Sequence, residues 1–239
     1  MTMKKLLFIF LFLIPFTVVK PLTVDDENDF VSESLFDKII RNQSADIEGL
    51  PDLRLLKTAL AGYELLSDQQ TFSSPGVITI IDYSLPSNKE RLWVIDLVNA
   101  KVIYRCLVSH GRNSGDLMAE NFSNKPGSYA SSPGFYSTGE TYKGKHGLSL
   151  KLDGLEKGIN DKARERAIVV HGADYVSPNF IRENGRLGRS LGCPAVPEEL
   201  STEIIETIKG GSCFFIYAPK ASYTANSPII SKINYEPKG

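Results

Sequence analysis

One thiol and one imidazole in this chain have the setting that covalent acyl transfer requires. Cys193 follows Gly192 in a stretch of small and polar residues, and His171 closes the apolar run 167–170. A thiol at its ordinary pKa is only slightly ionised at neutral pH, and a histidine that accepts its proton makes it a much stronger nucleophile. We therefore expect folding to bring Cys193 and His171 together as a nucleophile and its base.

Three residues beside this pair are candidates for a supporting role. Gly192 has no side chain, so an acyl group can approach the backbone and N–H groups can face a developing oxyanion. Gly172 follows the histidine and belongs to the same supporting set. Ser190 is interpreted as an orienting hydrogen-bond partner, because the sequence offers no second base to activate it, or equally as a turn residue that caps the loop.

A short strand and a loop must position these residues. Residues 167–170 are a short apolar run with charge before it and glycine after it, which is typical of a buried β-strand. The imidazole of His171 then lies at the end of this strand. A polar loop rich in Gly, Pro and Asn follows, and it can return Ser190 and Cys193 to the strand end.

The two motifs together resemble a known family. His-Gly followed at a distance by Ser-x-Gly-Cys is similar to the signature of the L,D-transpeptidases of bacterial cell walls, the YkuD-type catalytic domain. The sequence of residues 188–196, Gly-Arg-Ser-Leu-Gly-Cys-Pro-Ala-Val, is similar to the motif of the branch described as the murein L,D-transpeptidase catalytic domain family. Segments 61–63, 109–115, 125–128 and 164–167 also resemble that branch, so the resemblance covers roughly residues 50–218.

The resemblance implies an activity that strand patterns alone do not give. It implies a cysteine-dependent L,D-transpeptidase that acts on the tetrapeptide stems of peptidoglycan through a Cys193 thioester, releases D-alanine and forms cross-links. It implies no cofactor. Its partners would be peptidoglycan stem peptides, and we expect a monomer. Water in place of the acceptor amine would make the same site an L,D-carboxypeptidase, a hydrolase that trims stems.

Two positions differ from the usual family pattern. Most YkuD-type enzymes have a histidine just before Gly-Cys and an arginine two residues after the cysteine, where this chain has Leu191 and Ala195. We consider Arg189 and His110 as substrate-binding residues, since a guanidinium suits a carboxylate and His110 opens a polar loop at a strand end. The alternatives are a solvated loop arginine and a histidine that is hydrogen-bonded locally.

The same departures keep a second class of function open. A domain that retained the fold and lost the chemistry would be a non-catalytic module that binds the cell wall. A generic cysteine peptidase is the weaker alternative, because no Asn or Asp can be singled out as the residue that orients the histidine.

Composition excludes several other functions. The chain has 239 residues, 42% of them hydrophobic, which suits a packed globular domain. A net charge of −1 and a pI near 6.3 give no reason to expect binding to nucleic acid or to an anionic membrane surface. Its three histidines, His146 among them, lack zinc-type spacing with cysteine, so we predict no metal site.

The N-terminus predicts export. Lys4 and Lys5 precede the apolar run 6–19, which has the length of a signal-peptide core, so residues 1–20 are interpreted as a signal peptide. No Ala-x-Ala cleavage site follows, and an uncleaved anchor that tethers the protein to the membrane is the alternative. The expected location is the periplasm or the cell envelope.

Cys106 and Cys213 lie in strand-like runs and are interpreted as buried thiols, with a disulfide between them as the alternative.

Periodicity predicts a mainly β fold, a β-sandwich or roll with an active-site loop and one C-terminal helix, behind an α-helical N-terminal extension. The extension covers residues 21–72, with its better-supported helix at 53–66. The catalytic domain covers residues 73–218, and residues 219–239 form a disordered tail. Within the domain the predicted strands are 77–81, 91–97 and 101–108 as an antiparallel meander, then 148–152, 167–170 and 212–217, with a long polar loop at 109–146 and a helix at 197–209.

Overall fold

A computed structural model describes residues 34–43 and 49–235. The predicted signal segment, residues 1–20, and the first part of the helical extension lie outside the described residues. Among the residues that are described, every helix is too short or too polar to cross a membrane.

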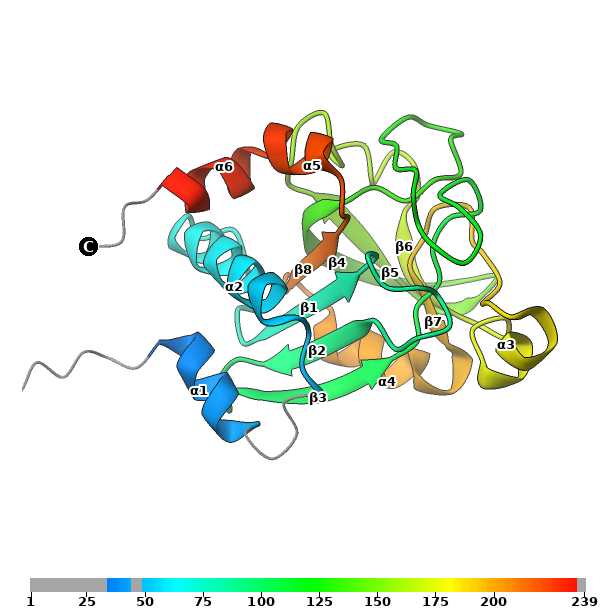
Figure 1. The fold of residues 1–239 in the computed structure, drawn as a ribbon, viewed down its shortest axis with the longest axis horizontal. Helices are drawn as coiled ribbons and strands as arrows, with labels where there is room; N and C mark the ends of the chain where they lie inside the picture. The colour runs from blue at the N-terminus through cyan, green and yellow to red at the C-terminus, as the bar shows by residue number, and fades with distance from the viewer. Residues whose placement is uncertain (1–33, 44–48, 236–239) are drawn as a thin grey trace, which may run out of the picture. The chain divides into compact units, whose positions relative to one another are not determined.

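The described chain is built around one mixed sheet of eight strands in the order β3-β2-β1-β8-β4-β5-β6-β7 (Figure 1). This confirms the predicted mainly β fold. The strands are β1 Val77–Asp82, β2 Leu92–Asp96, β3 Lys101–Cys106, β4 Gly134–Gly144, β5 Gly147–Gly154, β6 Val169–Ala173, β7 Ala195–Pro197 and β8 Cys213–Tyr217.

The first three strands form the predicted antiparallel meander. Side chains along a strand point to alternate faces, and in β1 and β2 both faces are buried, whereas the edge strand β3 exposes Lys101 and Arg105. In β2, Trp93 and Ile95 join the apolar cluster on one face, while Leu92 and Val94 join the cluster on the other. Burial on both faces explains why β1 and β2 are mostly apolar rather than strictly alternating.

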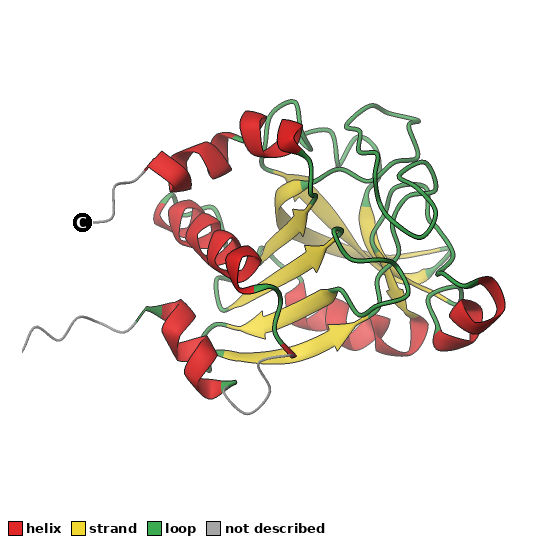
Figure 2. Cartoon of the chain, viewed as in Figure 1, coloured by secondary structure: helices red, strands yellow, loops and turns green. Residues whose placement is uncertain are grey.

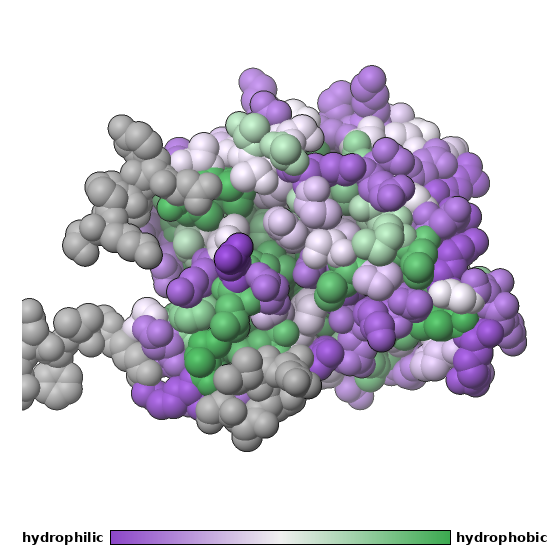
Figure 3. Space-filling view, viewed as in Figure 1, coloured by the Kyte–Doolittle hydropathy of each residue, from purple (hydrophilic) through white to green (hydrophobic). Residues whose placement is uncertain are grey.

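Helices cover the two faces of the sheet (Figure 2). On one face lie α1 Leu35–Asn42 and α2 Leu53–Asp68, whose apolar side chains belong to the same cluster as β1 and β8. The Asp52 side chain caps α2 by accepting the N–H groups of Arg54 and Leu55. Figure 3 shows apolar side chains gathered around these two helices, with hydrophilic side chains over most of the loops on the right of the view.

The other face is covered by α4 Glu198–Ile208, the helix predicted after the cysteine. It buries Ile204, Ile205 and Ile208 against the second apolar cluster. A short helix that the sequence analysis does not predict, α3 Pro178–Asn184, lies in the connection from β6 to β7. Ser177 caps its first turn, and Gly185 ends it in the left-handed conformation.

Two predicted irregular segments contain regular structure. The tail predicted as disordered forms α5 Ala221–Asn226 and α6 Pro228–Tyr235, and that prediction is wrong for these residues. The segment is mostly polar, which hides its structure in the sequence. All the same, the side chains of Tyr223, Ile229 and Ile230 are buried in the cluster that contains α2. The long loop 109–146 likewise includes β4, whose Gly, Ser and Thr residues hide the strand pattern.

The two cysteines of the core are free thiols. Cys106 and Cys213 are both buried, and neither forms a disulfide. They lie in different apolar clusters on opposite faces of the sheet, Cys213 with α2 and Cys106 with α4. The interpretation as buried thiols is confirmed, and the disulfide alternative is wrong.

Candidate active site

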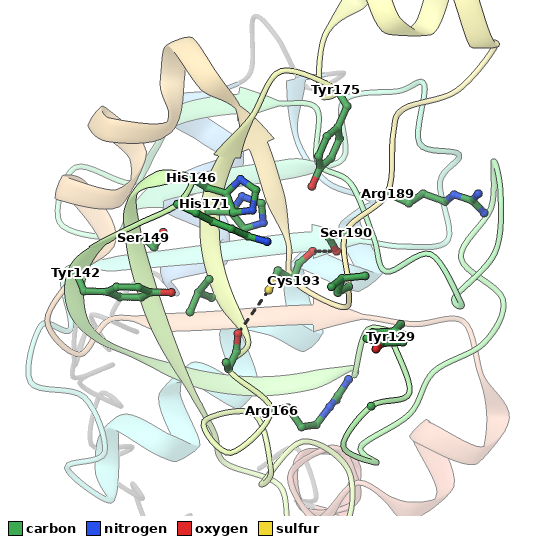
Figure 4. A pocket seen from close by; sticks show the side chains of 16 residues that line it. Tyr129, Tyr142, His146, Ser149, Arg166, His171, Tyr175, Arg189, Ser190 and Cys193 are labelled. Carbon is green, nitrogen blue, oxygen red and sulfur yellow. Dashed lines mark hydrogen bonds between the residues drawn. The ribbon is translucent and has the colours of Figure 1, made fainter.

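A pocket of about 500 Å³ contains the two candidate reactive side chains (Figure 4). His171 enters from β6, and Cys193 from the connection between β6 and β7. The rest of the wall comes from the β4–β5 hairpin, the β5–β6 connection and the loop before β4. The lining residues are Gly127, Tyr129, Tyr142, Gly144, Lys145, His146, Ser149, Arg166, Ala167, Val169, His171, Tyr175, Arg189, Ser190, Leu191 and Cys193.

Strand pairing explains how residues far apart in the sequence meet here. The three-residue strand β7 runs parallel to β6, with Ala195 paired to His171 and Val196 paired to Gly172. Cys193 lies two residues before that pairing, so its loop is fixed beside the strand that carries the histidine. In Figure 4 the ring of His171 and the sulfur of Cys193 face the same part of the pocket.

The backbone fixes the tautomer of His171. Its Nδ1 lies 2.8 Å from the carbonyl oxygen of Gly172. A carbonyl only accepts hydrogen bonds, so Nδ1 carries the proton of the neutral ring and Nε2 keeps a lone pair. Burial lowers the pKa of His171, and the charges of His146 and Lys145 lower it further, against the bond to Gly172. The ring is therefore neutral at pH 7 and available as a base.

The thiol of Cys193 is partly buried, and it is protonated at rest. Its Sγ lies 3.7 Å from the carbonyl oxygen of Ala167. Burial raises the pKa of Cys193, while a backbone hydrogen bond at Val169 and the charges of Arg166 and Lys145 lower it. The directions of the two pKa shifts predict a neutral thiol and a neutral imidazole in the same pocket, and Nε2 of His171 is the atom that can take the thiol proton when the sulfur attacks.

Gly192 must be glycine, for reasons of conformation and space. Its φ is +123°, a region that disfavours side chains, and a Cβ would lie 3.0 Å from the carbonyl oxygen of Ala130. Its N–H donates to Ser190 Oγ at 3.0 Å, so this amide is not free to face an oxyanion. No hydrogen bond is formed by the amide of Cys193 within the described residues, so this amide is one donor of the loop that is free to face an oxyanion.

The side chain of Ser190 makes two hydrogen bonds within its own loop. Its Oγ donates to the carbonyl oxygen of Cys193 at 2.6 Å and accepts the N–H of Gly192. These two bonds match both sequence interpretations, an orienting partner and a loop cap. Gly172 contributes through close packing, because a Cβ there would lie 2.7 Å from Ser201 Oγ of α4.

The two candidate substrate-binding residues have other partners. Arg189 lines the pocket, but its Nη1 donates to the carboxylate of Asp116 at 2.5 Å and to the carbonyl of Gly115 at 3.0 Å. His110 is fully buried and does not line the pocket. Its Nδ1 accepts from Arg91 Nη2 at 2.8 Å, and its Nε2 donates to Gly115 at 3.2 Å. The prediction that His110 faces the cleft is wrong, because a buried arginine holds it.

Several lining residues escaped the sequence analysis. His146, which the sequence analysis names only as one of three histidines without zinc-type spacing, stacks on His171 with ring centroids 4.4 Å apart. Lys145 and Arg166 bring positive charge to the wall, and the lining residues include no carboxylate. The sequence did contain a signal for this part of the pocket wall. Lys145 and His146 lie between two glycines, which is typical of a hairpin turn. Within the described ranges, no group of His, Cys, Asp or Glu could hold a metal ion.

Comparison with protein families gives a match over most of the chain. A family model described as L,D-transpeptidase catalytic domain matches residues 49–217. No curated protein matches.

Solved structures that resemble the chain do so weakly. They include an L,D-transpeptidase from Mycobacterium smegmatis (13% identity, 60% of this chain and 59% of that one, TM-score 0.37). Others are an L,D-transpeptidase from Mycobacterium tuberculosis (13%, 61% and 59%, 0.39) and the helical cell shape determining protein Pgp2 from Campylobacter jejuni (12%, 68% and 56%, 0.40). The chain spans less than two thirds of the length of each, and TM-scores this low carry no argument about its function.

Proposed function

Because the chain belongs to the L,D-transpeptidase catalytic domain family, we propose that it is a cysteine-dependent L,D-transpeptidase of peptidoglycan tetrapeptide stems. The observation that carries this proposal is the parallel pairing of β6 and β7, with Cys193 and His171 lining one pocket. Cys193 is the proposed nucleophile and His171 the proposed base.

The proposed reaction begins with the neutral pair. Nε2 of His171 takes the Sγ proton of Cys193 as the sulfur attacks the carbonyl carbon between the L-centre of the diamino acid and the terminal D-alanine. The amide of Cys193 is a donor available to the resulting oxyanion. Collapse of the tetrahedral intermediate breaks the C–N bond, and His171 gives its proton to the departing amine of D-alanine, which leaves a thioester.

An acceptor amine from a neighbouring stem resolves the thioester. The amine attacks the thioester carbon, His171 takes its proton, and the C–S bond breaks to release the Cys193 thiol with that proton. The product is an amide cross-link, and the enzyme returns to its neutral pair. The same site with water as the acceptor releases a shortened stem, which is the L,D-carboxypeptidase alternative.

Location and partners follow from this substrate. Peptidoglycan lies outside the cytoplasmic membrane, so we propose that the protein acts in the periplasm or the cell envelope with stem peptides as its partners. A tether through an uncleaved N-terminus remains the alternative to a cleaved signal. We also propose that the protein acts as a monomer.

Acylation by a carbapenem tests the proposed nucleophile. We expect purified protein incubated with a carbapenem to gain the mass of one adduct on Cys193, and Cys193→Ala to gain none. The control is Cys106→Ala, because Cys106 is buried outside the pocket and its loss should leave the adduct intact. A wild-type protein that stays unmodified would favour the non-catalytic wall-binding module.

Product analysis then separates the two acceptors. Incubation with defined tetrapeptide muropeptides should give cross-linked dimers and free D-alanine, as measured by mass spectrometry. Tripeptide monomers without dimers would replace the transpeptidase with the carboxypeptidase.

A further inference from the structure

The tip of the β4–β5 hairpin lies over the candidate base. Gly144 and Gly147 close the ladder between the two strands, and Lys145 and His146 form the turn. Gly147 has a φ of +76°, which a tight turn requires and glycine permits. Because both strands hold it, the turn presents His146 at a fixed place.

His146 covers one face of the His171 ring. The two rings are 4.4 Å apart between centroids and 23° from parallel, which is a stacked contact (Figure 4). A second constraint on the buried His171 ring is the bond from Nδ1 to the carbonyl oxygen of Gly172. A single hydrogen bond at one ring atom lets the ring pivot about that atom, whereas a ring stacked on its face resists the pivot.

We propose that His146 is a positioning residue for His171, and that its stacked ring fixes the plane in which Nε2 meets the thiol of Cys193. The proposal rests on the proposed function only for the use of the base, since the stack itself is geometry. His146 does not touch the reacting atoms in this role. It acts through His171.

Charge gives a second reason for an imidazole at this position. Two stacked rings cannot both be cations without strong repulsion, so a proton on His146 disfavours a proton on His171. This agrees with the lowered pKa of His171, for which His146 and Lys145 are contributing causes after burial. The titratable or charged groups that share the pocket with His171 are Tyr142, Lys145 and His146 from the hairpin, Arg166 from the β5–β6 connection, and Tyr175, Arg189 and Cys193 from the β6–β7 connection.

Two variants separate stacking from charge. His146→Phe keeps a flat ring over His171 and removes the titrating group. His146→Ala removes both. Lys143→Ala is the matched control, because Lys143 is exposed on the same hairpin and does not line the pocket.

The test measures the rate of Cys193 alkylation by iodoacetamide against pH, and the titration of the His171 ring by NMR. Neither readout requires the protein to be a transpeptidase. We expect His146→Ala to slow alkylation at pH 7 about tenfold, a fraction of what a general base contributes, and His146→Phe to stay within about twofold of wild type. Both variants should titrate His171 at a higher pH than wild type, and Lys143→Ala should match wild type in both readouts.

Thermal unfolding of each variant separates a positioning role from a structural one. If His146→Ala alkylates at the wild-type rate, or if His146→Phe slows alkylation as much as His146→Ala does, the positioning role is wrong. Equal loss of rate and of unfolding temperature in both variants would assign His146 to folding alone. If the wild-type protein gives no carbapenem adduct while the alkylation and NMR results follow the expectation, the proposed function fails and the positioning role stands.

Discussion

At the scale of single residues, the environment of the two proposed catalytic groups favours their neutral forms over an ion pair. Burial raises the pKa of Cys193 and lowers the pKa of His171, so the proton rests on sulfur and the ring is neutral. Charge then separates only when a substrate carbonyl is in place to receive the sulfur. The positive side chains Lys145 and Arg166 favour the thiolate, which partly offsets its burial.

Lys145 gives a prediction at this scale. Lys145→Gln removes a charge that lowers the pKa of Cys193, so that pKa should rise and the thiolate fraction at a given pH should fall. We expect iodoacetamide to alkylate Cys193 about two- to threefold more slowly at pH 8, while the rate still climbs with pH in both proteins. Lys143→Gln, an exposed lysine of the same hairpin outside the pocket wall, should alkylate at the wild-type rate. Equal rates in the two variants would show that Lys145 does not act on the thiol.

At the scale of elements, a buried arginine holds the segment that pairs with the loop of Cys193. Arg91 is fully buried and donates to the carbonyl oxygens of Leu85 and Val108 and to Nδ1 of His110. The backbone next to His110 then pairs with Ser190, through Ser190 N to His110 O at 3.1 Å and Arg112 N to Ser190 O at 2.8 Å. The backbone from His110 to Arg112 therefore supports the loop that carries Cys193.

His110 makes this support sensitive to acid. Burial and the charge of Arg91 lower the pKa of His110 to about 4, below the ordinary value of 6.5. The unfolded chain takes up a proton on this histidine below pH 6.5 and the folded chain does not, so stability is full above pH 6.5 and falls as pH drops toward 4. The loss from this residue should reach about 2–3 kcal/mol, and urea unfolding at pH 7 and pH 4.5 measures most of it.

His110→Gln is the matched variant. Glutamine accepts from Arg91 through its oxygen and donates to Gly115 through its amide, without a proton to gain. We expect this variant to lose less stability than wild type between pH 7 and pH 4.5. The same loss in both proteins would mean that other groups govern the acid side.

The elements also show what the sequence was able to predict. The strands β1, β2, β6 and β8 contain runs of apolar residues, and β3 and β5 mix apolar with polar residues at short spacing, so the sequence alone was enough to predict these six strands. β7 has three residues, too few for any period, yet its pairing with β6 joins Ala195 to His171. His110 was misplaced because its partner, Arg91, lies in another strand region, and only the fold reveals that an arginine is buried there.

At the scale of the whole described chain, the C-terminal helices close the apolar face on which α2 packs. Glu156, buried in the β5–β6 connection, accepts the N–H of Phe135 at 2.7 Å and the hydroxyl of Tyr223 at 3.3 Å, and it also accepts the hydroxyl of Ser227. One carboxylate thus ties β4 to α5 and to the start of α6. Burial raises the pKa of Glu156, while these hydrogen bonds oppose the shift. Residues 219–235 are therefore part of the folded unit.

Two double variants of α6 test whether this segment contributes to folding. Ile229 and Ile230 are buried in the cluster with α2, while Ser231 and Lys232 are exposed on the same helix. Replacing both isoleucines by alanine should cost about 2–5 kcal/mol, limited by the chance for α6 to detach instead of leaving a cavity. Ser231→Ala with Lys232→Ala should cost less than about 0.5 kcal/mol, since exposed substitutions rarely do more. Urea unfolding midpoints measure both, and two equal midpoints would mean that α6 adds nothing and that the folded unit ends near β8, as the sequence predicted.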